Sequence, residues 1–158
     1  MGYRKVGVIV SRTLMVAAVV GILTIVFSDK LFFKSDVNEI LGRHNIKLRD
    51  DFKIISNSSG GFMDYYHTFE LSISQADREE IIGKIKASKD FVVDSKNSFY
   101  LPDKTDRYSN TTIMANYEND SHFKHETYQT FEQGTAPTHE IIAVDKTSNR
   151  LTFEQVID

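Results

Sequence analysis

The five histidines are the side chains of this chain best suited to general acid–base chemistry or metal binding, because the sequence contains no cysteine. Two of them, His122 and His125, stand in the stretch HFKHE. This spacing matches neither H-E-x-x-H nor H-x-x-E-H. The neighbouring aromatic and threonine residues predict a strand, in which positions three apart point to opposite faces. We therefore expect solvated histidines on an edge strand here, and no metal site.

The other familiar catalytic patterns are missing from the sequence. There is no G-x-S-x-G motif, and the S-x-x-K match at 121–124 lacks its S-D-N and K-T-G partners. The pair Gly60-Gly61 is not followed by the helix and lysine of a phosphate-binding loop. Nothing marks out a pair of carboxylates for glycoside hydrolysis. We predict a non-catalytic protein without a bound metal or cofactor.

The stretch SSGGFMDYY, residues 58–66, is the predicted recognition surface. Aromatic residues and methionine beside a glycine pair are typical of protein interfaces. Alternation puts Tyr66 on a solvent-facing strand surface and His67 on the apolar one. The alternative is a hairpin loop whose rings tuck under the sheet while the glycines supply positive φ. The predicted binding residues are Phe62, Met63, Asp64, Tyr66 and His67.

Hydrophobic spacing predicts two helices that position these residues. The first runs from Asp36 to about Gly42, with Asp36 as N-cap in a capping box. The second begins after Ser74, which opens an S-x-x-D capping box, and ends by Ser88. Its apolar stripe, which should pack on a sheet, consists of Ile81, Ile82 and Ile85.

Strands account for most of the remaining chain. Alternation is clearest at 65–73, where Tyr65, Phe69 and Ile73 share one face. A shorter strand precedes it, and the turn formers of 57–61 separate the two. A polar connection around Pro102 leads to the last strands. The other predicted strands are 52–55, 111–117, 122–131, 139–144 and a final one after a hairpin loop at 145–149.

This order, β-β-α-β-β-β-β, predicts an α+β fold with a mainly antiparallel sheet packed against one helix. Parallel βαβ alternation is missing, which argues against a doubly wound nucleotide-binding fold. We expect the α+β domain at 51–158, preceded by a linker with a short helix at 31–50.

The N-terminal segment is predicted to be a transmembrane signal anchor at 13–30. The stretch 13–27 is uncharged, and the basic residues Arg4, Lys5 and Arg12 precede it. This asymmetry predicts a cytoplasmic tip at 1–12 and an exported C-terminal domain, in a single-pass protein. The weak cleavage pattern before Asp29 favours an anchor over a signal peptide cleaved after Ser28.

The charge of the exported part restricts its partners. Three of the 19 Lys and Arg residues precede Asp29, whereas all 22 Asp and Glu residues lie from Asp29 onward, so residues 29–158 carry a net charge of −6. Nucleic acid is therefore an unsuitable partner, and a basic protein is a suitable one. We expect a membrane-anchored envelope protein whose acidic domain binds another protein, as an accessory or an inhibitor or immunity-type partner. The alternative is a small or apolar ligand between helix and sheet, with His67 near the pocket mouth.

Overall fold

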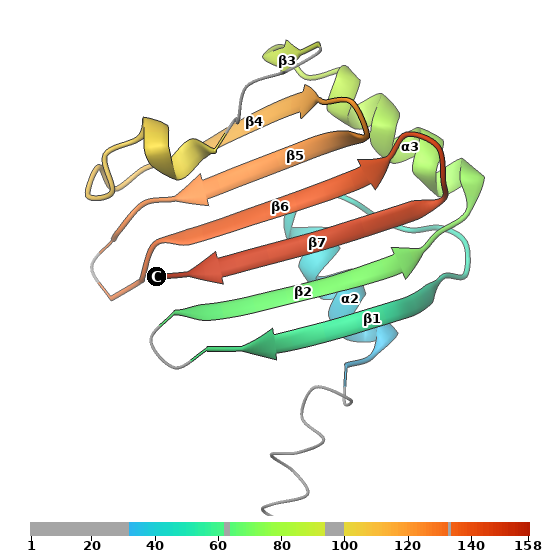
Figure 1. Cartoon of the computed structure of the whole chain (residues 1–158), viewed down its shortest axis with the longest axis horizontal. Coiled ribbons are helices and arrows are strands. Elements are labelled where there is room, and N and C mark those ends of the chain that lie inside the picture. Colours follow the sequence, from blue (N-terminus) through green and yellow to red (C-terminus); the bar gives the residue numbers. More distant parts are fainter. Residues whose placement is uncertain (1–31, 62–63, 94–99, 133) are drawn as a thin grey trace, which may run out of the picture. The chain divides into compact units, whose positions relative to one another are not determined.

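The computed structural model describes residues 32–61, 64–93, 100–132 and 134–158 (Figure 1). A compact unit spans Lys34–Asp158. It contains the helices α2 (Lys34–Arg43) and α3 (Gln75–Lys86), the short 3-10 helix η2 (Leu101–Lys104), and the strands β1 (Lys53–Gly60), β2 (Tyr65–Ser72), β3 (Phe91–Val92), β4 (Thr112–Glu118), β5 (His122–Gln129), β6 (Thr138–Asp145) and β7 (Arg150–Ile157). The α+β class predicted from the sequence is confirmed.

The predicted transmembrane segment, 13–30, lies outside the described residues. Among the helices that the structure does describe, none is long and apolar enough to cross a membrane.

The seven strands form one sheet in the order β1-β2-β7-β6-β5-β4-β3. Every neighbouring pair is antiparallel except β3 and β4, which are parallel. The mainly antiparallel sheet is therefore confirmed. Strand β3, only two residues long at one edge, is an addition to the predicted order, because so short a strand leaves no alternation to detect.

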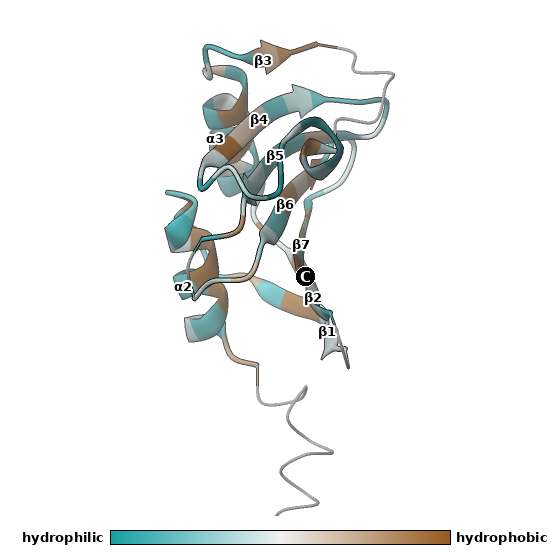
Figure 2. Cartoon of the chain, turned by 90° about the vertical axis from the view of Figure 1, so that its left-hand side faces the viewer, coloured by the Kyte–Doolittle hydropathy of each residue, from teal (hydrophilic) through white to brown (hydrophobic). Residues whose placement is uncertain are grey.

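Both helices cover the same face of the sheet, which we call the helix face (Figures 1 and 2). Helix α3 lies against β4, β5 and β6, while His44, just after α2, contacts β6 and β7. A second helix on the sheet was not part of the predicted layer. The main core between the helices and this face consists of Val37, Leu41, Phe69, Leu71, Ile81, Ile85, Ile142, Val144, Leu151 and Phe153, each at most 3% exposed.

Helix α3 begins as predicted. The Oγ of Ser74 accepts a hydrogen bond from the backbone N–H of Asp77 at 3.0 Å. The Asp77 carboxylate does not return to Ser74. It is 1% exposed and accepts hydrogen bonds from the backbone N–H groups of Arg49 and Asp50 instead. Ile82, predicted to be in the apolar stripe, is only half-buried, because the buried positions follow an i, i+4 spacing.

The predicted turn at 57–61 is wrong for most of its length. Residues up to Gly60 belong to β1, where Asn57 pairs with Phe69 and Gly60 with Tyr66. Strand β1 lies at the edge of the sheet, so its polar side chains can stay in contact with water. The turn itself starts at Gly61, whose φ of +130° and contact with Asp64 leave no room for a side chain.

Helix α2 begins two residues before the predicted N-cap, Asp36. Asp36 instead lies in the first turn, where its negative charge interacts favourably with the helix dipole. The helix buries Val37 and Leu41 completely or nearly so. It therefore contributes to the core of the domain.

The opposite face of the sheet carries a smaller hydrophobic cluster. Leu101, at the start of η2, packs with the buried residues Ala115, Tyr117 and Tyr128. The polar connection predicted around Pro102 thus contains one buried leucine that secures it to β4 and β5. We call residues 100–104 the η2 strap.

Candidate functional site

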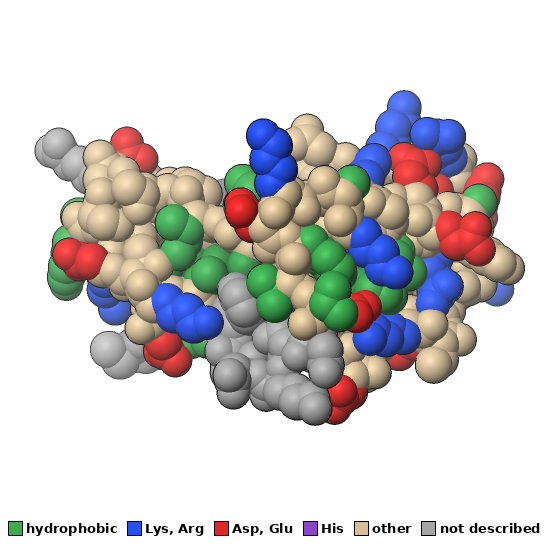
Figure 3. All heavy atoms as spheres, turned by 90° about the horizontal axis from the view of Figure 1, so that it is seen from above, with side chains coloured by type: hydrophobic (Ala, Val, Ile, Leu, Met, Phe, Trp, Pro, Cys, Tyr) green, Lys and Arg blue, Asp and Glu red, His purple; other side chains and the backbone are tan. Residues whose placement is uncertain are grey.

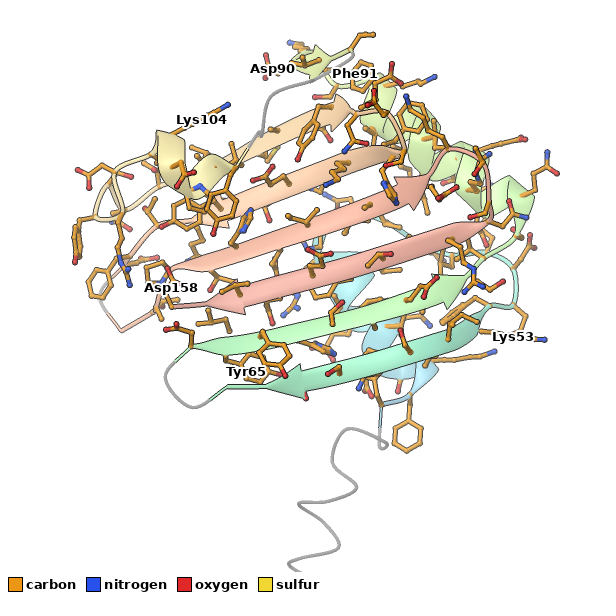
Figure 4. The ribbon with its side chains drawn as sticks, viewed as in Figure 1. Lys53, Tyr65, Asp90, Phe91, Lys104 and Asp158 are labelled. Carbon is orange, nitrogen blue, oxygen red and sulfur yellow. The ribbon has the colours of Figure 1, made fainter. Side chains whose placement is uncertain are left out.

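The predicted recognition surface lies at the tip of the β1–β2 hairpin. Phe62 and Met63 lie outside the described residues, and Asp64 is exposed. The Tyr66 side chain is 46% exposed and lies across Gly60, where an added Cβ would be 3.0 Å from the tyrosine hydroxyl. Tyr65 faces the helix side but is still 44% exposed, because it lies at the end of the sheet that carries the C-terminus (Figure 4).

His67 lies on the opposite face of β2 from Tyr66. Its Nε2 is 2.8 Å from the Oδ1 of Asn57, and its ring lies next to those of Phe69 and Phe153. The imidazole is half-buried in this position. The hairpin residues therefore do not all face one site.

A groove of about 290 Å³ lies on the helix face, where the sheet extends beyond the end of α2. Its lining combines Arg43 and His44 with side chains of β4, β5 and β6. A second hollow of about 270 Å³ shares His44 and His125 with the groove and continues toward Ile81 of α3. None of the predicted binding residues lines either hollow.

A carboxylate is held at the border between this groove and the core. The Nε2 of His44 lies 3.1 Å from the Oε2 of Glu140, close enough for an ion pair but not aligned as a hydrogen bond. Arg43 lies 3.6 Å from the Oε1 of Glu140, and Gln155 donates to this oxygen at 2.7 Å. Burial would raise the pKa of Glu140, but these contacts outweigh it and keep the pKa lowered.

His125 lies on the floor of the groove as a neutral imidazole. Asn116 donates its Nδ2–H to the Oγ of Ser88, which leaves its Oδ1 to accept from the Nδ1–H of His125 at 2.9 Å. The Nε2 of His125 therefore carries a lone pair. Burial, together with the nearby His44, lowers the pKa of His125 from 6.5 to about 4, so that it stays uncharged at neutral pH.

The positions of His122 and His125 correct part of the sequence interpretation. They point to opposite faces of β5, as predicted from their spacing. However, β5 is an inner strand between β4 and β6, so the expectation of an edge strand is wrong. Within the part of the chain that the structure describes, no three His, Asp or Glu side chains converge in a way that would hold a metal ion.

A second buried polar network secures the η2 strap to the opposite face. The carboxylate of Glu126, 1% exposed, accepts hydrogen bonds from the backbone N–H of Leu101, the hydroxyl of Tyr117 and the Nε2 of His139. Burial favours a higher pKa for Glu126, but these donors lower it overall. Burial, together with the neighbouring Glu126 carboxylate, raises the pKa of Tyr117. These hydrogen bonds connect the strap to β4, β5 and β6.

The residues that line the groove were not singled out from the sequence. His44 follows a helix, His125 lies in β5 and Glu140 in β6, and only the fold brings them together. One signal was present. In HEIIAV, alternation places Glu140 on the same face as Ile142 and Val144, and a charge among apolar positions is unusual.

No protein family, no curated protein sequence and no solved structure matches this chain.

Proposed function

We propose that this is a membrane-anchored binding protein without catalytic activity, whose C-terminal domain recognises another protein through the tip of the β1–β2 hairpin. The observation that carries the proposal is the exposure of two adjacent tyrosines, Tyr65 at 44% and Tyr66 at 46%. Tyrosine supplies a large, rigid contact area at low entropic cost, which is why it is enriched in protein interfaces. Asp64 beside them adds a charged rim.

The proposed location rests on the sequence. The uncharged stretch at 13–27, with basic residues before it, supports a single-pass anchor with a cytoplasmic N-terminus and an exported domain. The net charge of −6 on residues 29–158 supports a basic partner, as an accessory or inhibitor-type interaction would require.

The hairpin tip is a better interface candidate than the side of the domain that carries β3 and α3. That side intersperses Lys and Arg with Asp and Glu and shows no extended region of one sign (Figure 3). A basic partner would find no electrostatic preference there.

Capture of the partner from solubilised membranes by the full-length chain tests this function. The Phe62→Ala, Tyr66→Ala double variant should lose the partner and keep its circular dichroism spectrum. Tyr108→Ser is the matched control, because Tyr108 is 72% exposed in a different loop. If the double variant still captures the same protein, or if both variants lose it equally, the hairpin tip is not the interface.

A second function is favoured by the groove, namely binding of a small molecule between α2 and the sheet. Partly buried polar groups from α2, β5 and β6 converge on a cavity at the lower end of the size range of ligand pockets. His67 does not line this groove, contrary to the predicted position at its mouth.

A further inference from the structure

The helix face changes its chemistry along each strand, and the groove lies where it changes. In β6 the fully buried Ile142 and Val144 are preceded on the same face by Thr138 and Glu140. In β5 the buried Phe123 is followed by His125 and then by Thr127 and Gln129. The floor of the groove is therefore a hydrogen-bonding surface that continues directly from the hydrophobic core.

The charges at the groove are balanced. Arg43 and Glu140 lie 3.6 Å apart, and both oxygens of the Glu140 carboxylate already contact Arg43, Gln155 or His44. His125 is neutral. Because Arg43 and Glu140 are already paired, a charged ligand would find no unpaired opposite charge there and would lie close to a group of its own sign. An uncharged polar ligand would meet no such repulsion.

The remaining hydrogen-bonding capacity suits hydroxyl groups. The Nε2 of His125 offers a lone pair, and among the described residues no donor reaches it. The threonine hydroxyls at 112 and 127, which line the groove, can donate as well as accept. The hydroxyl of Thr138 already donates to the backbone oxygen of Ala136 and can still accept. A molecule bearing several hydroxyls can satisfy both kinds of group at once.

We propose that the groove binds a small, uncharged, hydroxylated molecule of about monosaccharide size, with a ligand hydroxyl donating to the Nε2 of His125. This inference rests on the second function proposed above and specifies its ligand class. The cavity of about 290 Å³ is too small for a drug-sized ligand. Met114, 61% exposed at the rim, provides an apolar surface for the C–H groups of a sugar ring.

The test follows the imidazole NMR resonances of the full-length chain, in a detergent without a sugar headgroup, during titration with glucose, galactose, ribose and myo-inositol. Glucuronate and glucosamine serve as negatively and positively charged analogues. At least one neutral probe should shift the resonance of His125 in a saturable manner and leave that of His122, on the opposite face, unchanged. Both charged analogues should bind more weakly than the parent sugar.

The His125→Phe variant keeps a planar ring but removes the acceptor, and should weaken binding by about tenfold, as expected for the loss of one hydrogen bond. His122→Phe, on the opposite face of the same strand, is the matched control and should bind like the parent. If His125→Phe does not fold, Thr127→Val supplies a second variant that removes one groove hydroxyl at nearly constant shape.

The outcomes separate the ligand class from the groove function. A charged analogue that binds as tightly as its neutral parent, with loss in His125→Phe, overturns the proposed class but keeps small-molecule binding by the groove. No shift of His125 with any probe contradicts both. Binding that His122→Phe weakens as much as His125→Phe places the ligand elsewhere and also overturns the inference.

Discussion

The Nε2 of His44, at the end of α2, lies 3.1 Å from the Oε2 of Glu140 in β6. The contact joins a helix to the middle of the sheet where the hydrophobic core ends and the groove begins. The Glu140 side chain is only 15% exposed, so its charge depends on these neighbours. The same contact thus stabilises the fold and fixes one wall of the groove.

Replacing Glu140 by Gln removes the charge and keeps the shape. We expect the free energy of unfolding to fall by about 1–3 kcal/mol, because His44 and Arg43 lose their partner and their contacts become weaker. Urea unfolding of the full-length chain followed by circular dichroism measures this change. Glu154→Gln is the control, since Glu154 is exposed and should change stability by no more than about 0.5 kcal/mol. Equal effects of the two substitutions would show that the His44–Glu140 contact contributes nothing.

The stability of the domain should fall between pH 6.5 and about 4 because of His125. Its pKa of about 4 in the folded protein is below the ordinary 6.5, so the unfolded chain binds this proton first as the pH falls. The stabilisation is complete above pH 6.5, and its loss reaches on the order of 3 kcal/mol by pH 4. The groups that face this imidazole are His44 and Glu140. Because the pKa of Glu140 is lowered, Glu140 stays charged in the upper part of this pH range.

The pH dependence is measured as the urea midpoint at several pH values from 7 to 4. The parent chain should lose stability from about pH 6 downward, and His125→Phe should show a flatter profile in this range. If the urea midpoint falls equally steeply with pH in the parent and in His125→Phe, the titration belongs to another group.

Substitutions in α3 should distinguish two neighbouring isoleucines. Ile81 is 2% exposed, and Ile81→Asp would bury a charge without a partner. We expect a loss of several kcal/mol, a large part of the roughly 5–15 kcal/mol typical of a whole domain. Ile82 is only half-buried, so Ile82→Asp should cost much less. Thermal melting of both variants checks this order, and a melting temperature that falls more for Ile82→Asp would refute the packing of α3.

The η2 strap should loosen when Glu126 is replaced by Gln. An amide cannot accept hydrogen bonds from Leu101, Tyr117 and His139 as the carboxylate does. The backbone amide protons of residues 100–104 should therefore exchange with solvent faster, while those of the main core stay protected. In the parent, the pKa of Glu126 is below the ordinary 4.5, so this stabilisation is present above pH 4.5 and is lost as the pH falls through the lower folded value. Unchanged exchange at Leu101 in Glu126→Gln would show that other contacts hold the strap.

Most of the sheet could be predicted from the sequence because alternation is local. The pattern around Phe69 and Leu71, and the hairpin before Leu151, each lie within one or two strands and indicate the buried face directly. Strand β1 could not be predicted over its whole length, because its polar residues resemble a turn unless the pairing with β2 is known.

The groove could be predicted only in part. The sequence indicates that Glu140 lies on an apolar strand face. The contacts of Glu140 with His44 and Arg43, however, depend on the placement of α2. The inner position of β5, and hence the burial of His125, depends on a strand order that local patterns do not specify. The hairpin tip, by contrast, was predicted from composition and strand alternation, and its function stays a prediction.

Site-specific photo-crosslinking tests the proposed protein interface most directly. A photoreactive residue is placed in the full-length chain at position 66, or at control position 108, which is more exposed, and irradiated in intact membranes of the producing cell. We predict one discrete crosslinked protein from position 66 that position 108 does not give. The absence of any product from position 66, or the same set of products from both positions, would contradict recognition through the β1–β2 hairpin.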